Sequence, residues 1–285
     1  MKSLSEFINN SELQIQEKKL LEIFNPNDIL TIMDIGSCEG ESSIRYSKLF
    51  SKAKIYAFEP LIKNFEKLTF NIKEYNCSNI FPFQLCLSDK DGQADFFISS
   101  AEKKNTEVSN WDFGNKSSSL LQPDKTLEIY NWLEFKDREL VRTQTLNTFC
   151  KQEKLNQVDF IHLDVQGAEL LVLSGANEFL ENLKTIWLEV EVIPLYKDQP
   201  LKKDIEKFLK ENGFSKIIDT VNHVSGDQFW INMDYYISII GKKNYYKVMI
   251  KMELINLKIN AYIKIKKITR RIKLGEKFKK LINLK

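Results

Sequence analysis

A short apolar run that ends in an acid and two glycines constrains the fold of this chain more than any other feature. The run at residues 29–33 is followed by Asp34, Gly36 and Gly40, and the sequence after Gly40 reads as a helix start. A strand, a glycine loop and a helix N-terminus leave backbone N–H groups free and let a ligand approach the main chain. The stretch therefore predicts a small-molecule site at the end of the first strand of an α/β domain.

Apolar runs and helical periodicities alternate along the rest of the chain, which favours a mostly parallel sheet covered by helices. A polar stretch from about residue 101 to 130 has weak periodicity and is of a length that is usually functional or mobile. The expected strands are residues 29–33, 53–60, 80–88, 89–99 (returning after a turn at Asp91-Gly92), 158–165, 185–194, 215–221 and 235–240. The expected helices are residues 11–24 (with a capping box at its start), 42–50, 61–75, 146–155, 167–183 and 202–214, the last closed by Gly213.

Acids at the ends of the first two strands predict a nucleoside ligand. Asp34 ends the first strand, and Glu59 ends the second at the position that typically accepts hydrogen bonds from ribose hydroxyls. A dinucleotide site would carry G-x-G-x-x-G, whereas this loop carries Glu39 and Glu41, which repel a pyrophosphate. The acids tolerate a cationic ligand such as S-adenosylmethionine. A methyl donor is therefore favoured, and a nucleotide-binding oxidoreductase is the first alternative.

Seven stretches of the chain, in order, resemble the FkbM family of methyltransferases over roughly residues 28–240. The most specific is DVQGAELLVLSGA, and Ser37-Cys38-Glu39 departs from the usual pattern. The stretches are IMDIGSCEGESS, IYAFEPLIKNFEKLTFN, CLSDKDGQADF, SSSLL, TLNTFC, VDFIHLDVQGAELLVLSGA and EVEVIPLYKDQPLKKDIEKFLKENGF. The resemblance implies a class I (Rossmann-like) fold with a seven-stranded sheet. It also implies methyl transfer from S-adenosylmethionine to a hydroxyl, often of a sugar in a surface glycan or related metabolite.

The donor residues follow from this reading. Asp34, Gly36 and Gly40 are expected at the methionine end of the donor and Glu59 at its ribose, while Cys86 and Leu87 close the third strand near the adenine. For the glycines, the alternative is simple turn chemistry.

Asp164 is the expected acceptor-positioning or base residue, because it ends the fourth strand, where acceptor and methyl group should meet. His162 lies two residues earlier, points to the same side of the strand and is the second expected catalytic residue. Capping of the next helix is the alternative role for Asp164, and stabilising that helix's dipole is the alternative for Glu169. His162 could instead be a core residue, and His223 is a weaker candidate base.

Further polar residues leave two alternatives open. Glu189 and Glu191 share a strand face, where unpaired acids are costly, so they either pair with Lys or Arg or approach the mouth of the active site. With Asp164 they could hold Mg²⁺, but no tight spacing requires it, so no metal ligand is assigned. The resemblance places residues 117–119 and Tyr196 near the acceptor.

The charge distribution divides the chain. Its formal charge is +3, but residues 242–285 carry fifteen Lys/Arg against two Glu, a net +13 that leaves the remainder at −10. We expect a helical lead-in (1–27), a methyltransferase domain (28–241) and a basic amphipathic tail (242–285). The tail is typical of peripheral contact with anionic lipid. Packing on the domain or in a homo-oligomer is the alternative, and nucleic acid is disfavoured.

The cysteines and the apolar runs bear on location. Cys38, Cys77, Cys86 and Cys150 lack C-x-x-C spacing and predict reduced thiols in a cytoplasmic protein. The sequence contains no run of about 18 apolar residues, so no membrane-spanning helix is predicted. A non-catalytic module that binds a partner or a membrane is the second alternative to a methyltransferase.

Overall fold

A computed structural model describes residues 3–101 and 114–241 of the chain. The chain divides into two compact units, Met1–Met233 and Asp234–Lys285. The predicted basic tail lies outside the described residues. Within the described part, no helix has the length and apolar character needed to cross a bilayer.

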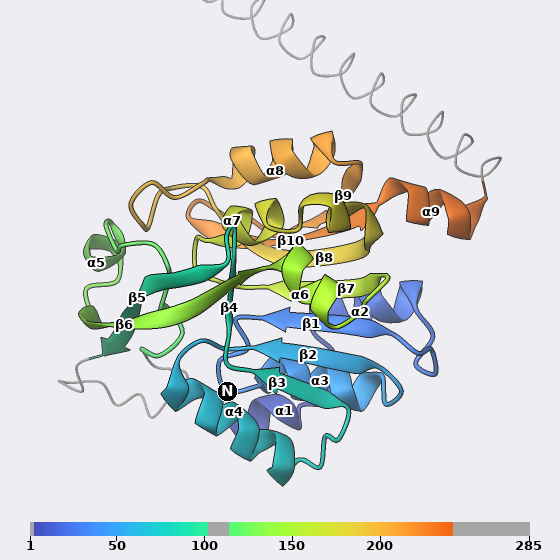
Figure 1. The fold of residues 1–285 in the computed structure, drawn as a ribbon, viewed down its shortest axis with the longest axis horizontal. Helices are drawn as coiled ribbons and strands as arrows, with labels where there is room; N and C mark the ends of the chain where they lie inside the picture. The colour runs from blue at the N-terminus through green and yellow to red at the C-terminus, as the bar shows by residue number, and fades with distance from the viewer. Residues whose placement is uncertain (1–2, 102–113, 242–285) are drawn as a thin grey trace, which may run out of the picture. The chain divides into compact units, whose positions relative to one another are not determined.

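The first unit is built on a seven-stranded sheet with the order β3-β2-β1-β7-β8-β10-β9 (Figure 1). All its neighbours are parallel except β10, which is antiparallel to β8 and β9. The central strands are apolar on both faces, as a covered parallel sheet requires: Ile32 and Met33 are fully buried. The strands are β1 (Thr31–Ile35), β2 (Lys54–Phe58), β3 (Ile80–Phe83), β7 (Val158–Leu163), β8 (Leu183–Glu191), β9 (Phe214–Asp219) and β10 (Ser225–Asn232). The predicted mostly parallel seven-stranded α/β fold is confirmed.

Helices pack along the whole width of this sheet. Figure 1 shows α4 beside β3 at one end of the strand order and α8 beside β9 at the other, and both pairs are in contact. The helices of the first unit are α1 (Leu4–Ile8), α2 (Ile15–Ile23), α3 (Glu41–Leu49), α4 (Ile62–Glu74), α5 (Thr126–Ile129), α6 (Leu146–Gln152), α7 (Glu169–Ser174), the 3₁₀ helix η1 (Asn177–Asn182) and α8 (Lys202–Glu211). Helix α9 (Met233–Ile240) belongs, after Met233, to the second unit.

A second, three-stranded sheet corrects the prediction for residues 80–99. It has the order β4-β6-β5, with β4 (Cys86–Ser88), β5 (Gly92–Ala101) and β6 (Leu133–Thr145). Residues 80–88 are therefore two strands in different sheets, separated by a tight turn in which the Leu85 N–H donates to the Phe83 carbonyl at 3.0 Å. The predicted return along residues 86–88 is also wrong, because β5 pairs with β6, a strand that the sequence pattern did not reveal.

The C-terminal elements of the described chain also differ from expectation. Residues 235–240 form helix α9, whereas the seventh strand is β10, which pairs with both β8 and β9. The helix predicted over residues 167–183 is broken into α7 and η1 at Gly175, where a Cβ atom would lie 2.1 Å from the Ser88 carbonyl oxygen. The first error arises because local periodicity does not record which strand fills a place in the sheet, and the second because it does not record the close approach of the Ser88 backbone.

A buried arginine ties the N-terminal helices to α3. Arg45, 5% exposed, pairs with Glu17 at 2.6 Å and also donates to the main-chain carbonyls of Phe7, Asn10 and Glu12. Removing one partner of such a pair costs about 3–5 kcal/mol. The helix predicted from residue 11 begins only at Ile15, where the Gln14 N–H donates to Glu17. The lead-in thereby supports the helix that follows the glycine loop.

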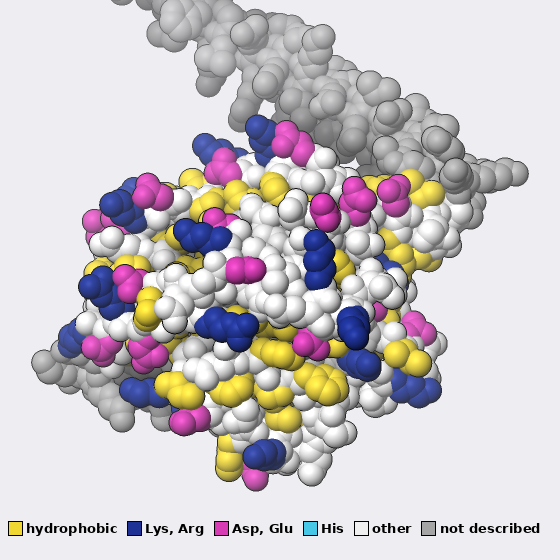
Figure 2. All heavy atoms as spheres, in the orientation of Figure 1, with side chains coloured by type: hydrophobic (Ala, Val, Ile, Leu, Met, Phe, Trp, Pro, Cys, Tyr) yellow, Lys and Arg dark blue, Asp and Glu magenta, His cyan; other side chains and the backbone are white. Residues whose placement is uncertain are grey.

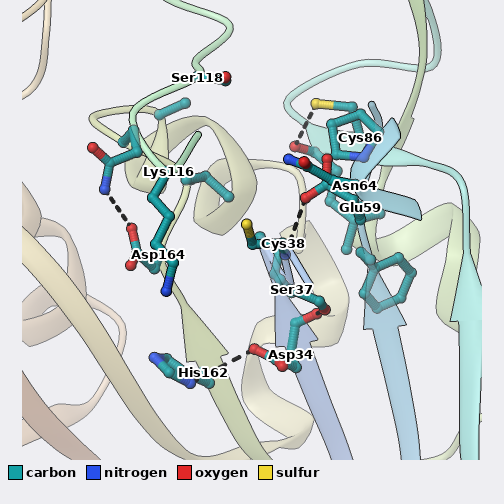
Figure 3. A pocket seen from close by; sticks show the side chains of 18 of the residues that line it. Asp34, Ser37, Cys38, Glu59, Asn64, Cys86, Lys116, Ser118, His162 and Asp164 are labelled. Carbon is teal, nitrogen blue, oxygen red and sulfur yellow. Dashed lines mark hydrogen bonds and ion pairs between the residues drawn. The ribbon is translucent and has the colours of Figure 1, made fainter. Parts of the chain in front are cut away.

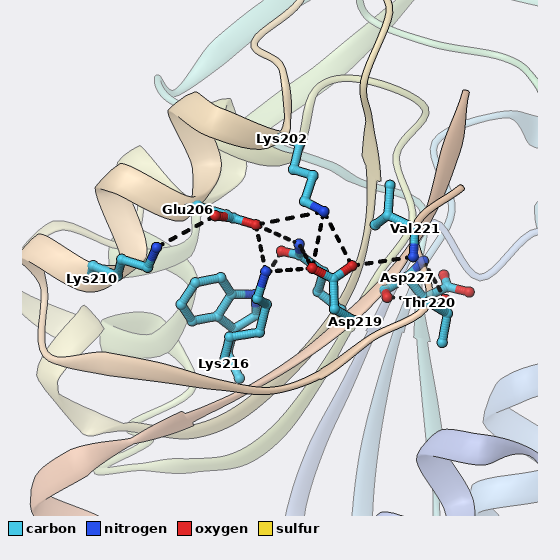
Figure 4. Close-up of polar contacts among 10 residues, drawn as sticks. Lys202, Glu206, Lys210, Lys216, Asp219, Thr220, Val221 and Asp227 are labelled. Carbon is cyan, nitrogen blue, oxygen red and sulfur yellow. Dashed lines mark hydrogen bonds and ion pairs between the residues drawn. The ribbon is translucent and has the colours of Figure 1, made fainter. Parts of the chain in front are cut away.

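Charged side chains hold the far edge of the sheet. Lys216 bonds Glu206 of α8 at 2.6 Å and also pairs with Asp219, which in turn bonds Lys202 at 2.9 Å (Figure 4). On the face seen in Figure 2, basic and acidic side chains of the described residues are interspersed, without a continuous basic area.

Candidate active site

A cleft opens where the order of the large sheet reverses, between the carboxyl ends of β1 and β7 (Figure 3). It encloses about 830 Å³, including its open mouth. Asp34, Phe58 and His162 line it from the ends of β1, β2 and β7, while Phe96 of β5 lines it from the small sheet. This is the place at which doubly wound sheets bind their ligands.

The glycine loop makes one wall of the cleft. The N–H groups of Gly36 and Ser37 donate to the Phe58 carbonyl at 3.1 and 2.9 Å, which fixes the loop to β2. Gly36 (φ +89°) lines the cleft. Gly40 (φ +87°) is not among the lining residues and packs against α4, where a Cβ atom would lie 2.6 Å from Leu68 Cδ1. The two predicted glycines are thus required for different contacts.

Glu59 directly follows the carboxyl end of β2, as predicted. Its Oε2 accepts the Cys38 N–H at 3.0 Å, and its Oε1 accepts the Leu61 N–H at 2.9 Å. Burial raises the pKa of Glu59 to about 8, although these hydrogen bonds act in the opposite direction. Asn64 of α4 lines the cleft beside it and also hydrogen-bonds it. Both oxygens of Glu59 are thus fixed by main-chain donors at the edge of the cleft.

Asp34 and His162 meet across the join between β1 and β7. Asp34 accepts a hydrogen bond from the Ser43 hydroxyl, and its Oδ1 lies 3.6 Å from His162 Nδ1. The Tyr46 hydroxyl lies 3.0 Å from the same ring nitrogen. Burial raises the pKa of Asp34, whereas His162 and Ser43 act to lower it. His162 is only partly exposed but lines the cleft.

The far end of the cleft is apolar. Cys86 and Leu87 line it as predicted, and Phe58, Leu85 and Phe96 join them. Burial raises the pKa of the Cys86 thiol, so it remains protonated. An apolar recess next to the polar Glu59 suits a flat aromatic base attached to a ribose.

Acids outnumber cations along the cleft, but not all of them face it. Glu41 lines the cleft and pairs with Lys116, and burial raises its pKa while Lys116 opposes this. Glu39 instead pairs with Lys67 at 2.6 Å and bonds Asn115 at 2.9 Å. The acidic lining therefore consists of Asp34, Glu41, Glu59 and Asp164.

Asp164 directly follows β7 on the open side of the cleft. The side chain of Gln166, two residues further on, holds it in place. Gln166 Nε2 donates to Asp164 Oδ1 at 2.7 Å and to Glu189 Oε2 at 3.0 Å. The backbone carbonyl of Gln166 accepts the Ser119 hydroxyl at 2.8 Å. Gln166 has φ +54° and joins three segments of the site. Asp164 is not a helix cap, because Ala168 takes that position for α7.

Two further carboxyls lie buried behind Asp164. Glu169 Oε1 accepts the N–H groups of Val165 and Gly167 at 3.0 and 3.2 Å, while its Oε2 has no hydrogen-bond partner. Burial raises the pKa of Glu169 to about 7 and that of Glu191 to about 10, where neighbouring acids add to the effect. No group of three or more His, Cys, Asp or Glu within residues 3–101 and 114–241 is placed to hold a metal ion. The Mg²⁺ alternative thus gains no support.

Of the other residues predicted to contact the acceptor, some line the cleft and others are buried beside it. Ser118 lines the cleft, while Ser119 and Tyr196 are almost fully buried. The Tyr196 hydroxyl donates to the Ser117 carbonyl at 2.7 Å. His223 is exposed in the loop before β10 and is not among the residues that line the cleft.

Several site residues escaped the sequence analysis. Asn64 and Tyr46 lie on helices, where nothing in the local pattern marks them. Lys116 precedes the serine run and could have been noticed there as a cation facing the acidic loop. Gln166 lies within the DVQGAELLVLSGA motif, and its role depends on contacts with Ser119 and Glu189, which are far from it in sequence.

The cleft fits the predicted donor, S-adenosylmethionine. The carboxyls of Asp34 and Glu41 could face its sulfonium and ammonium groups, Glu59 could accept hydrogen bonds from ribose hydroxyls, and the apolar recess suits adenine. A dinucleotide pyrophosphate would meet the same acids without compensating basic side chains other than Lys116 among the described lining residues.

Comparisons with known proteins agree with this geometry. A model of the methyltransferase FkbM domain matches residues 34–216. The chain is 30% identical over 193 residues to the 2-O-methyltransferase NoeI of Sinorhizobium fredii, covering 67% of this chain and 75% of that protein.

Solved structures give weaker similarities. M. capricolum TrmK in complex with S-adenosyl-homocysteine matches with a TM-score of 0.39 at 11% identity, covering 77% of this chain and 69% of that one. A SAM-dependent methyltransferase from Aquifex aeolicus matches with a TM-score of 0.36 at 13% identity, covering 81% and 98%. The fold assignment rests on the strand order, and the family on the sequence matches. The chain therefore belongs to the FkbM family of methyltransferases and is an S-adenosylmethionine-dependent methyltransferase, as the sequence predicts.

Proposed function

We propose that this enzyme methylates a hydroxyl group of a saccharide, with Asp164 as the residue that receives the proton. The observation that supports it most is the position of Asp164, which lines the open side of the donor cleft and is held there by Gln166 at 2.7 Å. The similarity to a 2-O-methyltransferase favours oxygen as the acceptor atom.

The chain's own residues divide the work between two sides of the cleft. Bound S-adenosylmethionine supplies an electrophilic methyl group. On the donor side, Asp34, Gly36 and Glu59 fix its position, and Gly40 shapes the loop. On the other side, Asp164 aligns the acceptor hydroxyl and removes its proton, a contribution of about 10²–10⁴-fold for a well-placed base.

His162 supports this arrangement from behind. Its Nδ1 lies near both Asp34 and the Tyr46 hydroxyl, so the ring is oriented between the donor side and the acceptor side. In this proposal His162 is a positioning residue, and it fixes the donor-side carboxylate relative to β7.

Methyl transfer to defined saccharides tests the proposal. The full chain is incubated with S-adenosylmethionine and a panel of mono- and oligosaccharides, and products are examined by mass spectrometry. A gain of about 14 mass units, one CH₂ in place of hydrogen, is expected on a hydroxyl. Transfer only to nitrogen, sulfur or carbon acceptors would contradict the proposal. Asp164→Asn serves as the inactive control.

The proposal also places the enzyme in the cytoplasm, at an anionic membrane surface. Residues 242–285 carry a net +13, and each Lys or Arg near an anionic bilayer contributes about 1 kcal/mol. Co-sedimentation of the full chain with phosphatidylglycerol vesicles at low salt, and its release at high salt, are expected. Equal behaviour with phosphatidylcholine vesicles would contradict the membrane role. A change in mass on sedimentation would favour a homo-oligomer instead.

A further inference from the structure

Three carboxyls lie on strands that are neighbours in the large sheet, and the first of them, Asp164, lines the donor cleft. Asp164 follows β7, Glu189 lies in β8, and Asp227 lies in β10 directly opposite Glu189 in the antiparallel register. Side chains at such a pair face the same side of the sheet, and like charges there are destabilising. This acidic row, defined as Asp164, Glu189 and Asp227, therefore costs stability, which points to a role other than folding.

Basic side chains do not neutralise the acidic row. None of the lysine or arginine ion pairs formed within the described residues includes any of its members, and the lysines nearest β10 are engaged with Asp219 and Glu206. Burial, followed by Asp164, raises the pKa of Asp227 to about 6, and His162 alone acts to lower it. Burial and Asp164 likewise raise the pKa of Glu189.

Gln166 holds two members of the row in a fixed relation. Its single Nε2 group donates to Asp164 Oδ1 and Glu189 Oε2, and the Ser225 side chain also hydrogen-bonds Glu189. From the opposite end, the loop before β10 is fixed because the Thr220 N–H donates to the Asp227 carbonyl at 2.9 Å and the Asp227 N–H donates back to Thr220 Oγ1 at 3.0 Å (Figure 4).

A buried carboxyl with unused hydrogen-bonding capacity adjoins the row. Glu191 is 1% exposed, and its Oε2 has no hydrogen-bond partner. It lies two residues beyond Glu189 on the same face of β8, and Glu189 and Asp164 both act on its pKa. Buried polar atoms are rarely left unsatisfied in native proteins. The region thus has an unused acceptor at Glu191, and among the described residues no Lys or Arg forms an ion pair with a member of the row.

We propose that the acidic row is the acceptor subsite, and that it selects a polyhydroxylated ring without negative charge, with an amino-bearing ring favoured over a neutral one. This inference rests on the proposed function. Sugar hydroxyls can donate to an ionised carboxylate and accept from a protonated carboxyl, so a row of mixed protonation satisfies them. A carboxylate or phosphate on the acceptor would be repelled, whereas an ammonium group would offset the uncompensated acids.

Binding of three matched sugars tests the selection. The full chain, saturated with S-adenosyl-homocysteine, is titrated with methyl glucosaminide, methyl glucoside and methyl glucuronide as probes, using ligand-observed NMR. The expected affinity order is glucosaminide, then glucoside, then glucuronide, with about tenfold between the extremes, which corresponds to about 1.4 kcal/mol. Equal or reversed affinities, or no binding of any probe, would overturn the inference.

Charge-neutral variants locate the effect. Glu189→Gln and Asp227→Asn keep the side-chain shape, and each should reduce the difference between glucosaminide and glucuronide. Asp95→Asn, in an exposed pair with Arg138 on the small sheet, should leave the order unchanged. If the order persists in both row variants, the row is not the subsite.

The inference and the proposed function can fail separately. S-adenosyl-homocysteine affinity is measured for each variant, which confirms that the donor side is intact. Methylation of an anionic sugar hydroxyl would contradict the charge selection and leave O-methylation standing. Normal probe selection without any methyl transfer to oxygen would contradict the proposed function alone.

Discussion

A Cβ atom on Gly36 would lie 1.9 Å from the carbonyl oxygen of Asp164. The glycine loop after β1 and the segment after β7 therefore touch through their main chains. The Asp164 N–H also donates to the Ile35 carbonyl at 3.0 Å. The donor wall and the proposed proton acceptor are thus built on one rigid contact, and a change in one displaces the other.

Gly36→Ala should disrupt this contact. The new methyl group would meet backbone that cannot rotate away, and φ +89° is unfavourable for any L side chain. We expect a loss of more than about 3 kcal/mol of stability, or a folded protein that no longer binds S-adenosyl-homocysteine. Thermal unfolding and calorimetry measure the two outcomes.

Gly213→Ala is the matched control for Gly36→Ala. Gly213 has φ +81°, and nothing lies within 4 Å of its Cβ position. It should cost only about 1 kcal/mol and leave donor affinity intact. Equal effects at the two glycines would show that backbone strain alone, and not the approach to Asp164, decides the outcome.

Glu59→Ala should weaken donor binding by about 1–3 kcal/mol, because the ribose hydroxyls would lose their acceptor. Calorimetry with S-adenosyl-homocysteine measures the change. Glu39→Gln, in the same acidic loop but directed at Lys67, should have little effect. Unchanged affinity in a folded Glu59→Ala protein would remove Glu59 from the ribose assignment.

Asp164→Asn should lower kcat by about 10²-fold or more while S-adenosyl-homocysteine affinity stays close to that of the parent protein. The amide keeps the size of the carboxylate but cannot accept the hydroxyl proton. Quenched-flow or steady-state methyl transfer gives the rate. Full activity would exclude Asp164 from proton transfer.

Chelation separates the proton-transfer reading from a metal-dependent one. Gln166 Nε2 donates N–H groups to both Asp164 and Glu189, an arrangement suited to carboxylates without a bridging cation. EDTA treatment should therefore leave kcat unchanged. Loss of activity that Mg²⁺ restores would replace proton acceptance by Asp164 with metal-assisted chemistry.

The sequence predicted the parts of the site that follow one another along the chain. Asp34, Gly36 and Glu59 could be placed because each directly ends a strand, and parallel strands bring their ends to one edge. Gln166 and Asp227 could not be, because their importance comes from partners in other strands. The small sheet was not predicted for the same reason. Its strand β6 follows the polar stretch and can be recognised only from its pairing with β4 and β5.

Buried acids should make the protein less stable as pH rises. The pKa of Glu169 is raised to about 7, of Glu59 to about 8 and of Glu191 to about 10, from a usual value of 4.5. Above pH 4.5 the unfolded chain releases these protons while the folded protein retains them, so the free energy of unfolding falls as pH increases towards each folded-state pKa.

The change should be visible in Tm between about pH 5.5 and 8.5 at constant ionic strength, since one pKa unit corresponds to about 1.4 kcal/mol per group. Over this range Glu191 is ionised in the unfolded chain and protonated in the folded protein, so Glu191→Gln should make Tm depend less steeply on pH. A Tm that rises with pH, or a slope unaltered by Glu191→Gln, would show that these carboxyls are ionised in the folded protein and find partners there.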